Sequence, residues 1–486
     1  MVLKRNDDIK VNAVLFYIKQ NKTMKNFQQP ITENLIESLR KQFKGTVIKP
    51  NDTSYDEVRK IYNAMIDKRP GAIAMCTDVN DVKVAVDFGR NNKLLVAIRG
   101  GGHNGGGLGL CDGGLVIDLS GLKSISVNTK SNTVKVGGGC VWNEVDTATQ
   151  EHGLAIPSGM VSSTGVGGLT LGGGVGYLAR KYGLTIDNLM GAEMVLANGS
   201  IVTANKNKNP DLFWAIRGGG GNFGVVTEFT FQAHKVNTVY GGPTLWPIEQ
   251  VEEIMEWFDG YIRTATDDIN GFIATMIIPE SPFPEHLHNK KYCGIVWCYV
   301  GDMTKAEEAF SPILAKKPLF AHIGEMPYTA IQTMFDGLLP TGMQWYWRAD
   351  FFNSLNADIR AQHLKFGSAI PTPLSQMHLY PITGAASRVG ATDTPWAYRD
   401  AEYCGVYIGV DPDPKNADKI TKWCKGYYEA LHPYSAGGAY SNFMMDEGQE
   451  RVQASYKQNY SRLASIKHQY DPTNFFRVNQ NIIPKS

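Results

Sequence analysis

Glycine is crowded into one quarter of this sequence. Thirty of the 51 glycines of the 486-residue chain fall between Gly100 and Gly224. At average glycine usage a window of this size would hold roughly nine. Glycine adopts left-handed backbone conformations and allows close backbone approach without steric cost. The window is therefore specialised for tight turns and close backbone contacts, which restricts the fold more than any other feature.

The glycines form three clusters, at residues 100–107, 165–176 and 218–224. Successive bare backbone N–H groups create a concavity that binds anions, and a helix N-terminus adds to the attraction. One such cluster alone is typical of hairpins and β-bulges. Three clusters in one domain favour a phosphate or dinucleotide site.

Two common nucleotide-binding patterns fit these clusters poorly. Gly174, Gly176 and Ala179 satisfy the letters of the Rossmann fingerprint. They lie at the end of the second cluster rather than after a leading strand, and Asp187 follows too early to bind a ribose. The Walker A pattern is absent from the sequence. The spacing argues against a nicotinamide-dependent Rossmann enzyme.

Composition and charge limit the partners. The chain is 43% hydrophobic and 20% charged, and its net charge of +1 predicts no attraction to nucleic acid or to an anionic membrane. The apolar run at residues 14–18 is too short for a membrane span, and no small-residue cleavage site follows it. We expect a cytoplasmic protein without membrane or nucleic-acid partners. The oligomeric state is not readable from the sequence.

Seven cysteines are scattered along the chain. Their odd number and irregular spacing predict neither a disulfide framework nor a metal site. A reducing compartment is the easier fit. We expect no metal.

The elements predict an α+β protein. Short β-like runs alternate with turns between residues 94 and 226, with helices at 81–91 and 142–151, and Asn198-Gly199 is a hairpin signal. From about 240 to 433 aromatic residues replace glycine, with a helix at 248–265 and strands at 292–300 and 343–352. A polar helix at 450–468 ends at an Asp471-Pro472 turn.

The clusters lie within longer ordered motifs. These are AIRGGGHN at 97–104, PSG at 157–159 with TGVGGLTLGGG at 164–174, and DLFWAIRGGG at 211–220 with NFGVV at 222–226. The chain ends with NYxRL at 459–463 and YDPxNFF at 470–476. From about Pro70 to Pro484 the chain resembles the berberine-bridge-enzyme-like branch of the vanillyl-alcohol-oxidase superfamily of FAD-linked oxidases.

This resemblance implies an α+β architecture in two domains. A two-part PCMH-type FAD-binding domain would comprise residues 30–237 and a C-terminal segment, 435–486, that returns to it. Residues 238–434 would form a substrate-binding domain with an antiparallel sheet covered by helices.

The resemblance also implies the cofactor and its ligands. His103 stands where the family bonds a histidine covalently to FAD. Many members have a second link through a cysteine, but here Val161 occupies that position, so we expect a single covalent link. The residues expected around FAD are Arg99, Gly100, Gly101, Gly102, His103, Asn104, Gly105, Thr164, Gly165, Gly168, Gly172, Gly224, Val226, Asn479 and Asn481.

The catalytic base is left open by the sequence. Phe443 stands where plant members carry a catalytic tyrosine, and a phenyl ring takes up no proton. Period-two alternation puts Gln344, Tyr346 and Arg348 on one strand face, and Gln376, His378 and Tyr380 on another. His378 titrates near neutral pH and suits a base. Tyr346, His378 and Tyr440 are the candidates, in no fixed order.

The resemblance implies an FAD-dependent oxidase that takes a hydride from a small alcohol, sugar or phenolic substrate. Thr164 stands beside the expected oxygen-reactive flavin carbon, and its small side chain favours O2 as acceptor, with formation of H2O2. Two alternatives remain: a dehydrogenase with another electron acceptor, and a flavin-binding protein without turnover.

Overall fold

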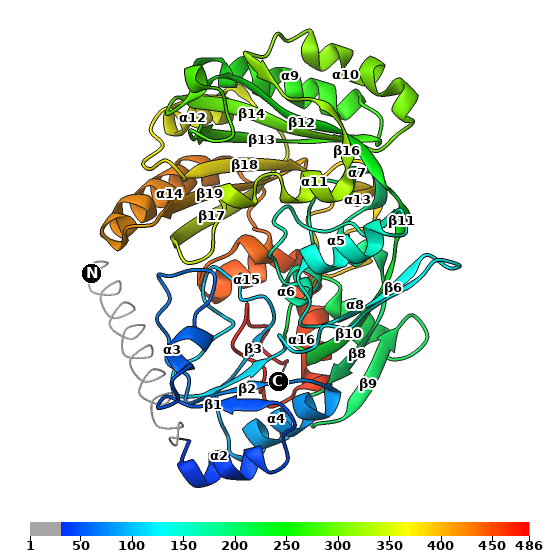
Figure 1. The fold of residues 1–486 in the computed structure, drawn as a ribbon, viewed down its shortest axis with the longest axis vertical. Helices are drawn as coiled ribbons and strands as arrows, with labels where there is room; N and C mark the ends of the chain where they lie inside the picture. Colours follow the sequence, from blue (N-terminus) through cyan, green and yellow to red (C-terminus); the bar gives the residue numbers. More distant parts are fainter. Residues whose placement is uncertain (1–30, 486) are drawn as a thin grey trace, which may run out of the picture.

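The computed structural model describes residues 31–485 as three smaller sheets, of four, five and two strands, and one large sheet, with their covering helices. The apolar run at 14–18 lies outside the described residues. In Figure 1 the large sheet and its helices form the upper part, and residues 31–235 together with the C-terminal helices form the lower part. This confirms the predicted α+β class.

The first small sheet has the order β1-β2-β4-β3. Strands β2 (Ala72–Met75), β4 (Leu115–Asp118) and β3 (Val96–Arg99) are parallel, and β1 (Thr46–Ile48) is antiparallel to β2. Helix α4 (Val79–Asn91) connects β2 to β3, and the Asp78 carboxylate caps its first turn. Strand β3 ends at Arg99, so the sheet delivers the first glycine cluster at the carboxyl edge of its parallel strands.

The second sheet has five antiparallel strands in the order β5-β6-β10-β8-β9. They are β5 (Ile125–Asn128), β6 (Thr133–Gly137), β10 (Val225–Gln232), β8 (Leu189–Val195) and β9 (Ile201–Asn205). The predicted hairpin at Asn198-Gly199 joins β8 to β9, and Gly199 has the left-handed φ of 83° that the turn requires.

The large sheet has eight antiparallel strands, with the order β15-β12-β14-β13-β18-β19-β17 and β16 on β12. Helices α9 (Val251–Thr264), α12 (Ala357–Gly367) and α14 (Ala417–Leu431) share one apolar core with one face of this sheet. Its other face shares a core with the glycine-rich part of the chain. The strands are β12 (Thr238–Pro247), β13 (Ile269–Ile277), β14 (Lys291–Tyr299), β15 (Phe320–Ala321), β16 (Gly324–Pro327), β17 (Gln344–Phe352), β18 (Gln376–Pro381) and β19 (Tyr403–Asp411).

The predicted helices at 81–91, 142–151 and 248–265 correspond to α4, α5 and α9. The helices besides α4 are α2 (Glu33–Arg40), α3 (Tyr55–Val58), α5 (Trp142–Gln150), α6 (Val166–Gly172), α7 (Ala179–Tyr182), α8 (Pro210–Ile216), α9 (Val251–Thr264), α10 (Ala306–Leu314), α11 (Tyr328–Thr333), α12 (Ala357–Gly367), α13 (Ala385–Arg388) and α14 (Ala417–Leu431). Two short strands, β7 (Leu154–Ala155) and β11 (His234–Lys235), pair with each other.

The C-terminal segment returns to the glycine-rich part. The predicted single helix at 450–468 is wrong, because the chain forms α15 (Gln449–Tyr456) and α16 (Tyr460–Tyr470). Lys457, between them, has a left-handed φ of 46°, which cannot continue a helix. The buried Lys467 ammonium of α16 donates to the Asp471 carboxylate at 2.7 Å and to the Asn222 carbonyl at 2.6 Å. The pair fastens the chain end to the third glycine cluster.

We propose the predicted boundaries, 237/238 and 434/435, as the domain division. Strand β12, at the first boundary, begins the large sheet at Thr238. Helix α14 and the turn after it end the substrate part at about residue 434.

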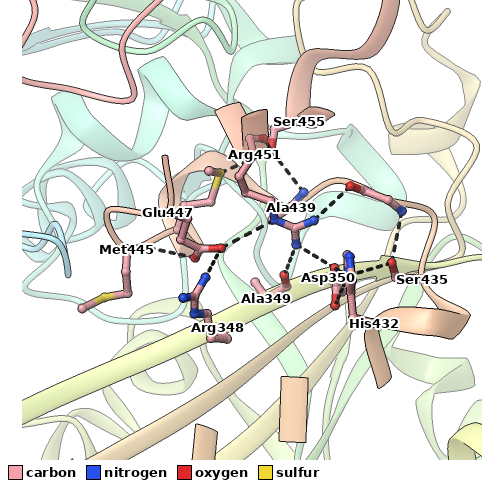
Figure 2. A network of polar contacts seen from close by, with 12 residues as sticks. Arg348, Ala349, Asp350, His432, Ser435, Ala439, Met445, Glu447, Arg451 and Ser455 are labelled. Carbon is pink, nitrogen blue, oxygen red and sulfur yellow. Dashed lines mark hydrogen bonds and ion pairs between the residues drawn. The ribbon is translucent and has the colours of Figure 1, made fainter. Parts of the chain in front are cut away.

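A buried ionic network holds the start of the C-terminal segment against strand β17 (Figure 2). Arg451 of α15 donates to the Asp350 carboxylate at 2.6 Å, and His432 Nδ1 lies 3.1 Å from the same carboxylate. Arg348 lies 2.5 Å from the Glu447 carboxylate, which also accepts from the Met445 backbone N–H. The network thereby fixes residues 439–447 relative to the large sheet.

All seven cysteines are buried and free. Among the described residues, no three His, Cys, Asp or Glu side chains lie where they could hold a metal ion. None of the helices between residues 31 and 485 combines the length and apolar character needed to cross a bilayer.

We expect Arg451→Met to lower the free energy of unfolding by about 3–5 kcal/mol, because it leaves the buried Asp350 carboxylate without its main partner. Denaturant unfolding followed by circular dichroism measures the change. As a control, Glu57→Gln breaks the exposed Lys60–Glu57 pair and should cost at most about 1 kcal/mol. Equal stability of Arg451→Met and wild type would contradict a structural role for the network.

Candidate functional site

A cavity of about 360 Å³ lies between the glycine clusters and the inner face of the large sheet. All three clusters contribute to its wall, as do strands β13, β17, β18 and β19. Phe335, Leu338 and Leu339, around the short helix at 336–338, close another side. Asp336 fastens this segment by accepting from the Ser162 hydroxyl at 2.5 Å and from the Ser162 N–H at 3.1 Å.

The first two clusters cross in direct backbone contact. A Cβ atom on Gly101 would lie 2.5 Å from the backbone nitrogen of Gly165, and a Cβ on Gly165 would lie 2.4 Å from that of Gly101. Non-bonded carbon atoms attract best at about 3.5–4.0 Å, so neither position tolerates a side chain. The crossing brings His103 and Thr164 to the same cavity.

Other glycines of the clusters border open space in the cavity. A Cβ on Gly168 or on Gly221 would meet no protein atom within 4 Å, and both residues line the cavity. Two buried polar atoms of lining residues, Arg99 Nη1 and Asn479 Oδ1, have no hydrogen-bond partner among residues 31–485. Open backbone beside an unpaired guanidinium nitrogen and an amide oxygen suits a phosphate-bearing dinucleotide.

His103 is held in a defined orientation at the cavity wall. Its ring stacks on Tyr62 with 4.0 Å between ring centroids, and its Nε2 lies 3.0 Å from the Ser163 hydroxyl. Burial lowers the pKa of His103 to about 4, so the imidazole is neutral at physiological pH. Tyr62 also donates to the Leu339 carbonyl at 2.9 Å. No local pattern in the sequence singled out Tyr62, which is far from the motifs.

Most residues expected to bind FAD line this cavity, and three lie behind it. Gly105 lies beneath the Trp347 indole, Gly172 lies against the Asn442 side chain, and the Asn481 carbonyl accepts from Gln449. The lining residues from the prediction are Arg99, Gly100, Gly101, Gly102, His103, Asn104, Thr164, Gly165, Gly168, Gly224, Val226 and Asn479, and Val161 is beside them.

The prediction that Tyr346 faces the substrate pocket is wrong. The alternation along β17 is as expected, but Trp345 and Trp347 line the cavity. Tyr346 lies on the opposite face, where the Lys425 ammonium of α14 is 5.8 Å from its ring centroid and Arg348 donates to its hydroxyl at 3.1 Å. Charged partners from α14 and from the C-terminal segment satisfy this polar face, which leaves the indoles for the cavity.

Strand β18 presents a hydrogen-bonded row to the cavity: Gln376, His378 and Tyr380. His378 Nδ1 lies 2.6 Å from the Tyr380 hydroxyl, and its Nε2 lies 2.8 Å from Gln376 Oε1. Burial lowers the pKa of His378 to about 3. The expectation that His378 titrates near neutral pH is therefore wrong, because the buried imidazole stays neutral and both of its nitrogens are hydrogen-bonded within the row.

Tyr440 also lines the cavity, and its oxygen is already occupied. It accepts hydrogen bonds from the Gly174 N–H and from the Asn442 amide, both at 2.7 Å. Burial raises the pKa of Tyr440 well above its ordinary value. Phe443 lies beside it at the cavity wall, with 4.8 Å between the ring centroids.

Two family models match the chain. The model described as an FAD binding domain matches residues 70–205, and the model described as berberine and berberine like matches residues 439–483. An FAD-linked oxidoreductase of Dictyostelium discoideum is 32% identical over 469 residues, which cover 95% of this chain and 99% of the relative. The chain belongs to the berberine-like FAD-linked oxidoreductases. It is therefore an FAD-dependent enzyme, as predicted.

Other members of the family are similar over nearly the whole length. The (R)-6-hydroxynicotine oxidase of Paenarthrobacter nicotinovorans is 28% identical, with 91% of this chain and 97% of the relative covered. The crystal structure of 6-hydroxy-D-nicotine oxidase from Arthrobacter nicotinovorans superimposes with a TM-score of 0.82 at 26% identity, covering 91% of this chain and 98% of that one. The fold and the PCMH-type class of FAD oxidases are thus those predicted.

Gly168→Ala should separate folding from cofactor binding. Alanine is favoured over glycine in a helix by about 0.5–1 kcal/mol, so this change within α6 should not destabilise the protein. The added methyl group enters open cavity space, and we expect less FAD per chain in the purified protein, measured by absorbance. Gly260→Ala in α9 is the matched control, since its Cβ also meets no atom within 4 Å. Equal FAD content in both variants would contradict this placement of the cofactor.

Proposed function

We propose that this enzyme is an oxidase that removes a hydride from a neutral, hydroxyl-bearing substrate and passes the electrons to O2. The observation that carries the proposal is one cavity that joins the glycine clusters to the polar row on β18. FAD, when bound, supplies the hydride acceptor. The glycine clusters, Arg99 and Asn479 would hold it, and the sheet face would hold the substrate.

His103 is proposed as the single covalent attachment point. Its neutral ring is held by Tyr62 and by Ser163, whose hydroxyl occupies Nε2 and leaves Nδ1 for the bond. Val161, which lines the cavity nearby, has no nucleophilic atom. A bond to imidazole would fix the flavin against a rigid loop and make it a stronger oxidant.

The substrate class follows from the charge of the cavity wall. Among the described lining residues, Arg99 carries the only fixed charge, and it pairs with Asp118 at 2.5 Å in the glycine-rich part. The wall formed by the large sheet offers aromatic and aliphatic side chains with Gln376, His378 and Tyr380 as its polar groups. Such a wall suits a neutral, ring-bearing alcohol or phenolic compound. One relative is named (R)-6-hydroxynicotine oxidase, and a ring-bearing substrate for this enzyme agrees with that name.

Thr164 supports O2 as the electron acceptor. Its small side chain lines the cavity where the second cluster passes His103. A small residue leaves dioxygen access to a flavin in this position, whereas a bulky residue would hinder it.

The covalent link is tested by acid precipitation of wild type and His103→Ala. We expect the wild-type pellet to stay yellow and the variant to release its flavin into the supernatant, because His103 is the proposed attachment point and alanine offers no nucleophile in its place. Absorbance near 450 nm in both fractions gives the ratio. Flavin retained in the variant pellet would reveal a second attachment, and a colourless wild-type pellet would rule out the covalent bond.

The electron acceptor is tested by reducing the enzyme anaerobically and mixing it with air-saturated buffer. We expect fast return of the oxidised flavin spectrum, and Thr164→Leu should slow it roughly tenfold or more, a barrier increase of about 1.4 kcal/mol. Thr164→Ser is the matched control and should reoxidise like wild type. A wild-type flavin that stays reduced in air would instead indicate a dehydrogenase.

A further inference from the structure

We propose that Tyr380 accepts the proton of the substrate hydroxyl while it passes its own proton to His378. The proposal rests on the proposed function, since that function supplies the hydride acceptor. Position 443 carries phenylalanine and therefore has no hydroxyl group. Tyr380 of strand β18 offers a phenol hydroxyl beside it. The Tyr380 and Phe443 rings lie side by side, with 5.8 Å between their centroids.

The direction of the hydrogen bonds follows from Gln376. Its amide nitrogen donates to the Leu374 carbonyl at 3.4 Å, so its oxygen faces His378. That oxygen accepts only from a protonated nitrogen, which puts the proton of the neutral imidazole on Nε2, 2.8 Å away. Nδ1 therefore carries a lone pair, and the Tyr380 hydroxyl donates to it at 2.6 Å.

A phenol that donates its own proton keeps both oxygen lone pairs for incoming donors. Tyr380 is in this state, because its proton is directed to His378. Tyr440 is in the opposite state, because the Gly174 N–H and the Asn442 amide occupy its oxygen. Tyr440 can donate to a substrate oxygen, whereas Tyr380 can accept a substrate proton.

Burial requires the two proton movements to be coupled. Both side chains lie within the protein core, with 6% of Tyr380 and 6% of His378 exposed. A separate phenolate or a separate imidazolium would be a poorly solvated charge there, which is why burial raises the pKa of Tyr380 and lowers that of His378. Proton uptake by Tyr380 with simultaneous release to His378 avoids the phenolate. The imidazolium on His378 forms together with the negative charge that the hydride brings to FAD, so it is not a lone charge in the cavity.

The carbinol C–H bond of the substrate breaks with both electrons, which go as hydride to the bound FAD. The substrate O–H bond breaks, its proton goes to the Tyr380 oxygen, and the Tyr380 proton goes to His378 Nδ1. The substrate leaves as a carbonyl compound, oxidised by two electrons. The proton on His378 returns through Tyr380 when O2 is reduced to H2O2.

The first test compares the binding of phenol and anisole, which differ in a donated hydroxyl proton. We expect wild type to bind phenol about tenfold more tightly, as one hydrogen bond to a buried group provides. Tyr380→Phe should remove this preference. Perturbation of the flavin absorbance gives both dissociation constants. A wild type without preference, or a Tyr380→Phe variant that keeps it, would overturn the proposal.

A second buried tyrosine–histidine pair provides the matched control. Tyr427 of α14 lies 2.6 Å from Nδ1 of His363 in α12, on the helix-covered side of the large sheet. Tyr427→Phe removes a bond of the same kind and length away from the cavity. It should leave the phenol preference intact, and loss of preference in both variants would mean a general packing effect and overturn the assignment.

The second test reads the tautomer of His378 by nitrogen NMR of protein labelled in its ten histidines. His378→Gln identifies the signal. We expect a neutral ring protonated on Nε2, with an Nδ1 resonance that moves in Tyr380→Phe and stays in Tyr427→Phe. A proton on Nδ1 of His378 would reverse the hydrogen bond and overturn the relay.

Turnover then separates this inference from the proposed function. With the alcohol that produces peroxide in wild type, Tyr380→Phe should lower the rate of anaerobic flavin reduction by about 10²-fold or more, with little change in substrate affinity. Adding Phe443→Tyr to the Tyr380→Phe variant should restore part of the rate, because it returns a hydroxyl group to the adjacent ring. If wild type contained no flavin or produced no peroxide, the proposed function would be refuted. If Tyr380→Phe reduced its flavin as fast as wild type, only the proton relay would be refuted.

Discussion

The backbone crossing of Gly101 and Gly165 is the constraint on which the site depends. Any side chain at either position would overlap the backbone of the other loop, since the distances would be 2.4–2.5 Å. The crossing brings the end of the parallel sheet and the start of α6 together, and with them His103 and Thr164. The dinucleotide cradle is thus a consequence of two loops without side chains, not of a Rossmann strand-turn-helix unit.

The large sheet forms the other wall of the cavity, and its two faces carry different side-chain chemistry. Along β17, the indoles of Trp345 and Trp347 face the cavity, while Tyr346, Arg348 and Asp350 face the helices and the C-terminal segment. Buried charges are stable only when they are paired, and Arg451, Glu447 and His432 supply the pairing (Figure 2). The same network holds residues 439–447 against the cavity. The ion pairs on one face of the sheet therefore position residues that line the cavity on its other face.

Burial also determines which polar groups can take part in proton transfer. His378, Tyr380 and Tyr440 all lie in the core at the cavity wall, where a lone charge is strongly disfavoured. Their roles depend on which lone pairs are free, and that depends on neighbours from other elements: Gly174 and Asn442 for Tyr440, and Gln376 for His378. A residue type alone does not make a base in such a site.

The family, the α+β class and the positions of the glycine loops could all be predicted from the sequence. These features are encoded locally, because glycine clusters, the hairpin at Asn198-Gly199 and the terminal motifs each act through neighbouring residues. Most residues expected around FAD line the cavity for the same reason. The alternation along β17 and β18 was equally readable, since it follows from strand geometry.

The face of each strand that meets the cavity depends on contacts between distant parts of the chain. For β17, the polar face turned away because the charged partners, Glu447 and Arg451, arrive from a segment about a hundred residues later. The helix expected at 450–468 broke at Lys457 because Asn459 donates to carbonyls near residue 394, a contact that no local pattern contains. The stacking of Tyr62 on His103 is likewise a contact between residues far apart in the sequence. Such contacts depend on the packing of residues that are far apart in the sequence, so patterns within a short stretch of sequence cannot predict them.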